Sequence, residues 1–73
     1  GVMKNMKIKV ENNLDEIVVE LERLGYKKHI WEHLINTGYV VAFESGVYTN
    51  VDFNPVNEIY ALTTLAELKE MKK

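Results

Sequence analysis

The sequence predicts a small α+β domain, with helices on one face of a mainly antiparallel sheet. Three observations support this class: an alternating apolar run near the start, a helical apolar stripe after it, and two β-forming runs around a Ser-Gly turn. The expected order is β-α-(short element)-β-β-β-α. Residues 1–73 form a single domain in this prediction, and residues 1–5 and 70–73 are expected to fray.

The composition excludes several classes of protein. The chain has 73 residues and no cysteine, which excludes a disulfide scaffold and a cysteine-based zinc site. With 47% apolar residues it does not fit the disordered class, and its net charge of −2 gives no general attraction to nucleic acid or anionic lipid. No apolar run reaches the roughly 18–20 residues that span a bilayer. We expect a cytoplasmic protein with no signal peptide and no membrane partner.

The first two elements follow from side-chain periodicity. Met6, Ile8 and Val10 alternate with lysines, which predicts a half-buried strand. Asn13 is placed to cap the next helix with its side-chain oxygen, and Gly25 is placed to end it in the left-handed conformation. The helix carries one apolar stripe, made of Leu14, Ile17, Val18, Leu21 and Leu24.

Residues 27–37 are ambiguous from the sequence. A helical stripe that begins at Ile30 favours a short helix or an irregular turn. The alternation of Tyr26, Lys28 and Ile30 also fits the start of a short strand. We expect the helix or turn.

A β-hairpin is predicted around a two-residue turn, Ser45-Gly46, in which the glycine supplies the positive φ angle. This register pairs Ala42 with Thr49 on one face and places Phe43 opposite Tyr48 on the other. The core-facing hairpin residues would then include Val40, Ala42, Val47 and Val51.

Two more elements follow the hairpin. Residues 58–62 form a further short strand in this prediction, after a turn at Pro55. Thr64 and Glu67 have the spacing of a capping box, which opens a final helix. The apolar side chains of that helix, Leu65, Leu68 and Met71, would face the sheet.

The run His29-Ile30-Trp31-Glu32-His33 has the spacing H-x-x-E-H of inverted zinc peptidases. Two imidazoles one helical turn apart can reach one metal ion, and a neighbouring carboxylate can activate its water. Such a site also needs a third ligand and a cleft, for which a chain this short has little room. We therefore expect no metal, two exposed histidines and a buried Trp31. Metal binding by His29, Glu32 and His33 is kept as an alternative.

Four aromatic residues are the candidate contact surface. A sheet with two short helices leaves one face uncovered, and exposed aromatic patches mark interaction sites. The residues expected to meet a partner there are Tyr39, Phe43, Tyr48 and Tyr60. The same rings could instead complete the core.

The first helix also has an acidic face, made of Asp15, Glu16, Glu20 and Glu22. A solvated helix surface is the ordinary interpretation of such a face. The sharper interpretation is a surface that docks on a basic site of a partner.

Three pieces of the chain carry a resemblance to a known group. They are the opening strand with the acidic helix that ends in Leu24-Gly25-Tyr26, the hairpin at 40–51, and the closing run at 62–71. Together they resemble the short uncharacterised α/β proteins common in phages and prophages of Gram-positive bacteria. The resemblance implies an accessory role, binding and inhibiting a host or defence protein, and it implies no functional residue.

The function expected from the sequence is therefore that of a protein-binding module, not an enzyme, and without a cofactor. The partner is a protein, or a second copy of the chain in a homodimer. One alternative is a metal or small-ligand site at His29, Glu32 and His33. Another is single-stranded nucleic acid on the aromatic face, which is less favoured because the neighbouring residues are neutral or acidic.

Overall fold

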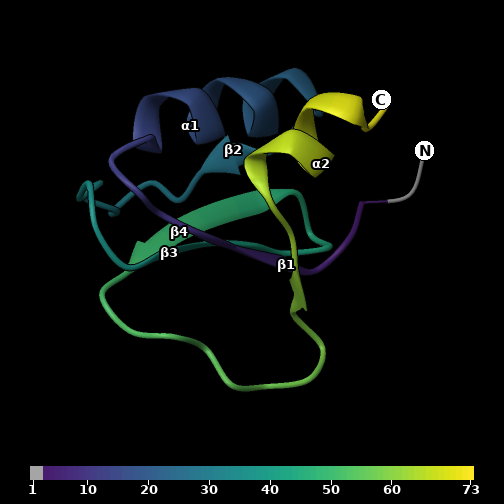
Figure 1. Ribbon diagram of the computed structural model, residues 1–73. Coiled ribbons are helices and arrows are strands. Elements are labelled where there is room, and N and C mark those ends of the chain that lie inside the picture. The colour runs from purple at the N-terminus through teal and green to yellow at the C-terminus, as the bar shows by residue number, and fades with distance from the viewer. Residues whose placement is uncertain (1–2) are drawn as a thin grey trace.

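The computed structural model describes residues 3–73, which form one five-stranded sheet with α1 and α2 on the same face (Figure 1). This arrangement confirms the predicted α+β class. The strands are β1 (Met6–Lys9), β2 (Lys27–Lys28), β3 (Tyr39–Ala42), β4 (Val47–Val51) and β5 (Ala61–Leu62). The helices are α1 (Leu14–Arg23) and α2 (Leu65–Glu70).

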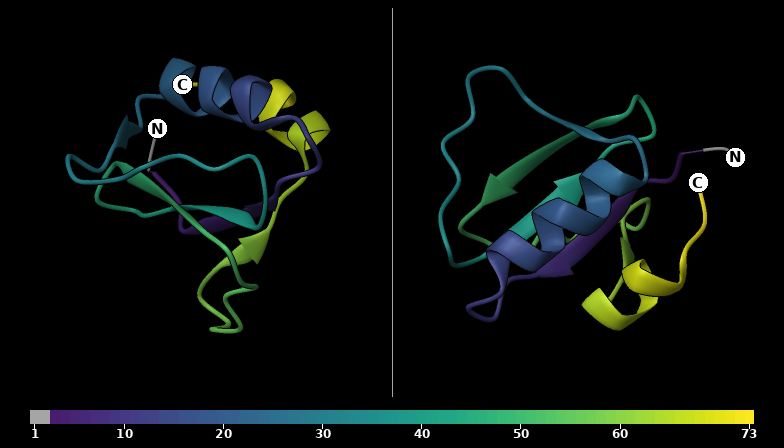
Figure 2. Two further views of the ribbon diagram at one scale, coloured as in Figure 1. Left: turned by 90° about the vertical axis from the view of Figure 1, so that its left-hand side faces the viewer. Right: turned by 90° about the horizontal axis from the view of Figure 1, so that it is seen from above.

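The strands lie in the order β2-β4-β3-β1-β5. The three central strands pair antiparallel, as expected, whereas β2 joins β4 and β5 joins β1 in parallel. The strand predicted at 58–62 is reduced to its last two residues. Because β4 and β5 run in the same direction, residues 52–60 must return along the sheet, and they do so on the face opposite the helices (Figures 1 and 2). We call residues 52–60 the strap.

The end of α1 follows from its sequence. Its apolar stripe faces the sheet, with Ile17 and Leu21 fully buried. Gly25 has a φ angle of +102°, as predicted. Its N–H donates to the Glu22 carbonyl, and the N–H of Tyr26 donates to the Leu21 carbonyl, which is the Schellman pattern of a helix C-terminus.

The cap at the start of α1 differs from the prediction. Asn13 occupies the N-cap position, but its side chain makes no cap hydrogen bond and instead accepts from the N–H of Glu11. The N–H of Leu14 donates to the side-chain oxygen of Asn36, at 3.2 Å. The orphan donor of the helix is thus satisfied by a residue from a distant loop, because the Asn13 oxygen is already used within its own turn.

The predicted hairpin register was wrong by one residue. Phe43 and Val47 close a three-residue loop, in which the N–H of Gly46 donates to the Phe43 carbonyl. Ala42 therefore pairs with Tyr48, and Val41 pairs with Thr49. Because side chains alternate across a strand, this slip exchanges the faces of β4. Val47 and Val51 leave the helix-facing core, and Tyr48 and Asn50 enter it.

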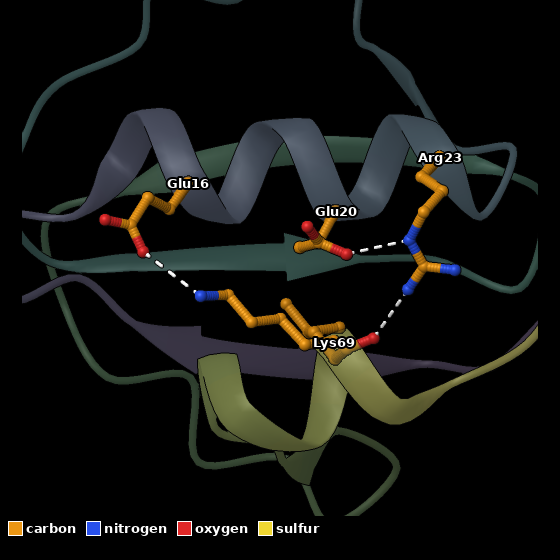
Figure 3. A network of polar contacts seen from close by, with 5 residues as sticks. Glu16, Glu20, Arg23 and Lys69 are labelled. Atoms are coloured by element: carbon orange, nitrogen blue, oxygen red, sulfur yellow. Dashed lines mark hydrogen bonds and ion pairs between the residues drawn. The ribbon is translucent and has the colours of Figure 1, made fainter.

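Helix α2 begins as predicted. Thr64 accepts a hydrogen bond from the Glu67 N–H, and the Glu67 side chain accepts one from the Thr64 N–H, which confirms the capping box. Leu68 is fully buried in the common core. Beside it, Arg23 of α1 donates to the Leu68 carbonyl at 2.8 Å and Lys69 lies 3.6 Å from Glu16, so the two helices are also joined at their surface (Figure 3).

The segment after α1 begins with β2 and then continues without regular structure to β3. The strand alternative was right for its first residues and the irregular turn for the residues that follow, and no helix forms there. Residues 1–2 of the predicted frayed N-terminus lie outside the described residues. Lys4, in the same stretch, hydrogen-bonds the Tyr26 hydroxyl through both its N–H and its carbonyl.

Candidate functional site

The structure divides the four predicted contact aromatics between two faces of the sheet. Tyr39 and Phe43 lie on the face opposite the helices, where the Tyr60 ring of the strap meets Phe43 edge-on at 5.9 Å. All three are half-buried. Tyr48 is 1% exposed on the helix face, because of the register slip. The predicted four-ring patch therefore does not form.

Tyr48 joins the sheet to α1. Its hydroxyl donates to a carboxylate oxygen of Glu22 at 2.6 Å. Burial of the phenol raises its pKa above the ordinary value, and the bond to Glu22 raises it further, because a phenolate there would be desolvated and next to a negative charge. Tyr48 is thus held neutral inside the domain and is not placed to touch a partner.

The His29–His33 run lies on an irregular turn, so its four-residue spacing does not put both imidazoles on one helical face. Glu32 is turned toward the sheet, where its carboxylate accepts from the N–H of Asn50 at 3.2 Å. Within residues 3–73, no group of three histidine, aspartate or glutamate side chains could hold a metal ion. The geometry on which the metal alternative depended is therefore not present in the described part of the chain.

Residues 29–37, which we call the Trp31 loop, are fastened to the free edge of β4. The N–H of His29 donates to the Tyr48 carbonyl at 2.9 Å, which continues the parallel pairing of β2. Beyond that point the backbone N–H of Asn50 donates to the Glu32 carboxylate, where a neighbouring strand would otherwise supply a backbone carbonyl. A sheet edge that would otherwise offer unpaired backbone groups is thus covered by this loop.

Asn50 fixes the second half of the Trp31 loop. Its buried side chain accepts from the N–H of Ile35 at 2.5 Å and donates to the carbonyls of Thr37 and Tyr39 at 3.2 and 2.9 Å. Leu34, the residue before Ile35, packs against the core. The loop is therefore held by several hydrogen bonds and one apolar contact.

The apolar side chains at the tip of this fastened loop point into solvent. Ile30 is 77% exposed and Trp31 is 81% exposed, so the predicted burial of Trp31 was wrong. The ring was expected to be buried because Trp31 would lie on the apolar stripe of a helix, and no helix forms there. A Trp and an Ile that are adjacent, exposed and carried on a fixed backbone have the features of an interaction hot spot.

The border of this apolar tip is basic. Lys27 and Lys28 of β2 precede it, and all four flanking basic or imidazole residues are exposed: Lys27, Lys28, His29 and His33. Glu32, the acidic residue of the loop, is engaged with Asn50. On a chain with a net charge of −2, this is a local region of opposite sign.

The strap exposes a second group of apolar residues: Phe53, Val56 and Ile59. It is tied to the sheet by Lys7, whose ammonium donates to the side-chain oxygen of Asn54 at 2.8 Å and to the Pro55 carbonyl at 2.6 Å. Val41 on this face is only 3% exposed, so the face opposite the helices is not bare.

The chain matches no protein-family model, and no curated protein or solved structure is similar to it. Of the helices in residues 3–73, none has the length and apolar character needed to cross a bilayer.

Proposed function

We propose that this protein is a non-enzymatic protein-binding module that uses Ile30 and Trp31 as its contact anchors. The observation that supports the proposal is the exposure of these two side chains on a loop fixed by Glu32 and Asn50. Holding the tip in one conformation reduces the entropy that a partner's binding would cost. Although the domain is small and its core is thin, several part-buried hydrogen bonds hold this loop in place.

The proposed anchors are not the residues of the predicted aromatic patch. Tyr39, Phe43 and Tyr60 are half-buried beside the strap, whereas the ring of Trp31 is almost fully accessible. The accessory role in the cytoplasm, binding and inhibiting a host or defence protein, remains part of the proposal. It is supported by the resemblance in the layout of the chain.

The test is affinity capture of a partner from a lysate of the source cell or its host, with three versions of this chain as the immobilised protein. Wild type is compared with Trp31→Ala and with Val56→Ala, which shortens an 86% exposed residue on the strap. We expect wild type and Val56→Ala to retain one stoichiometric protein that Trp31→Ala loses. With the purified partner, Trp31→Ala should weaken binding by about 30-fold, the change produced by losing a hot spot of about 2 kcal/mol. Equal binding by all three would overturn the proposal.

A further inference from the structure

We infer that the Trp31 loop binds the solvent face of α1 in a second copy of this chain, so that the molecules associate head to tail. This inference depends on the proposed function, because it concerns the same loop, and it assigns that loop to a second copy of this chain in place of a host or defence protein. It follows from the chemistry of two exposed surfaces that one molecule carries.

The first surface is the outer face of α1. Val19 is 62% exposed at the middle of this face. The residues three and four positions away are its neighbours on the helix surface. Three of them are acidic, Asp15, Glu16 and Glu22, and the fourth is Arg23. A shallow depression adjoins Val19, and Asp15, Glu16, Glu20 and Lys69 complete its lining. The surface is an apolar centre with a mainly acidic border.

The two basic residues beside Val19, Arg23 and Lys69, are each paired with a carboxylate of the same molecule, and Lys69 lies 3.6 Å from Glu16. Arg23 bonds the Glu20 carboxylate at 2.7 Å and donates to the Leu68 carbonyl at 2.8 Å (Figure 3). Its guanidinium is therefore held toward α2. Asp15 is exposed in the first turn of α1 and faces away from the sheet.

The second surface is the tip of the Trp31 loop, which has the opposite charge. Its apolar centre is Ile30 and Trp31, and its border is Lys27, Lys28, His29 and His33. An apolar contact between the two centres would bring lysines next to carboxylates. Both kinds of complementarity, apolar and electrostatic, therefore match between these surfaces.

Charge also decides between two ways of pairing identical molecules. A symmetric contact of one Trp31 loop with another would bring together two borders that carry the same basic charge. A contact of the loop with α1 avoids this repulsion. Seen from above, the loop runs along the margin of the sheet and meets α1 at the start of the helix, where the N–H of Leu14 donates to Asn36 (Figure 2). Because Trp31 and Val19 are both exposed, one molecule can present both surfaces at once. Such head-to-tail contacts form rings or filaments.

The test uses two variants that each remove one surface. Trp31→Ser removes the loop anchor, and Val19→Lys puts a positive charge at the centre of the acidic face. Both residues are mostly exposed, so both variants should keep the fold, which circular dichroism checks. In sedimentation equilibrium we expect wild type to form species larger than a dimer and each variant alone to stay monomeric.

Mixing the two variants is the decisive step. The intact α1 face of Trp31→Ser can bind the intact loop of Val19→Lys, but neither molecule can extend the chain. An equimolar mixture should therefore sediment as a dimer. Raising NaCl from about 0.05 to about 0.5 M should weaken this dimer roughly tenfold, because the flanking charges are screened.

Other outcomes would overturn the inference. A wild-type protein that stays monomeric at every concentration excludes self-association, and capture through Trp31 would still support the proposed function. A dimer that Trp31→Ser abolishes and Val19→Lys preserves would indicate a symmetric loop contact. Binding of Trp31 to a foreign protein with no mass change in the mixture would place the partner outside this chain.

Discussion

At the scale of single residues, Tyr48 links sheet and helix through a neutral phenol. The folded state raises its pKa, whereas the unfolded chain has the ordinary value of 10.0. Above that pH the unfolded state has lost the proton and the folded state keeps it. The unfolded state then binds fewer protons, so the free energy of unfolding must fall as pH rises.

The prediction concerns alkaline stability. Wild type should lose stability in urea titrations as the pH rises through 10.0, and Tyr48→Phe should lack this component. At neutral pH the same variant should lose about 1.5 kcal/mol, the value of a hydrogen bond to a charged acceptor at the low end of its range. Tyr60→Phe, which keeps the ring contact with Phe43, is the control. A parallel pH profile for wild type and Tyr48→Phe would contradict the argument.

Asn50 is the residue on which the shape of the Trp31 loop depends. In Asn50→Asp the oxygen that accepts from Ile35 is kept, but the amide that donates to the carbonyls of Thr37 and Tyr39 is replaced by a carboxylate oxygen. A buried polar group left without its partner costs about 1–3 kcal/mol.

We expect Asn50→Asp to lose at least about 2 kcal/mol and to raise amide hydrogen exchange across residues 29–37. The matched control is Asn54→Asp, which makes the same change at an exposed residue whose oxygen accepts from Lys7. That control should keep wild-type stability. If the two variants behave alike, Asn50 does not hold the loop.

At the scale of elements, α2 has only six residues and depends on its cap. Hydrogen bonds from the Thr64 N–H and hydroxyl lower the pKa of the Glu67 carboxyl. The unfolded chain keeps the ordinary, higher pKa. The cap bonds to the Glu67 carboxylate therefore add to the free energy of unfolding at pH values above that ordinary pKa. This contribution is lost as the pH falls through the lower pKa of the folded state.

Thr64→Ala removes the hydroxyl bond to Glu67 but keeps the bond from the backbone N–H, so the pKa of Glu67 should rise only part of the way toward its ordinary value, as measured by NMR titration. The substitution should also destabilise the domain by about 1 kcal/mol at neutral pH, through loss of the N-cap. Thr64→Ser keeps a hydroxyl at the cap and should retain most of the wild-type behaviour. An unchanged Glu67 titration in Thr64→Ala would show that the bond from the Thr64 hydroxyl does not lower its pKa.

Elements determined by neighbouring residues could be predicted, and those determined by distant contacts could not. The Gly25 helix end and the Thr64 cap use groups within a few positions of each other, so the sequence indicated both. The hairpin register depends on whether the turn around Ser45-Gly46 has two or three residues, and both lengths suit a glycine there. The parallel edges depend on chain reversals that no local pattern encodes.

The difference between local and distant contacts also explains why the exposure of Trp31 was not predicted. Trp31 was expected to be buried in a segment predicted as a short helix or an irregular turn, and its loop is instead fixed in an exposed position by Asn50 from another strand. The one available signal was an asparagine in a strand otherwise made of β-forming residues. Only the three-residue turn places that asparagine on the inner face, where it needs hydrogen-bond partners.

At the scale of the whole molecule, the sheet is covered by helices on one face and by the strap on the other. The strap is held by Lys7 through Asn54 and Pro55, and by the edge-on contact of Tyr60 with Phe43. Phe43 is therefore one of the residues on which the strap packs. Because its ring is half-buried, we expect it to stabilise the fold more than a fully exposed aromatic ring would.

The expected consequence is a difference between two phenylalanines. Phe43→Ala should lower the free energy of unfolding by about 2 kcal/mol, roughly half the cost at a fully buried site, since it removes the ring on which Tyr60 packs. Phe53→Ala, at a 60% exposed residue of the same strap, should change it by less than about 0.5 kcal/mol. Chemical denaturation of both variants measures the two values. Equal small losses would mean that the strap lies on the sheet without stabilising it, and that the domain depends on its helix-covered face alone.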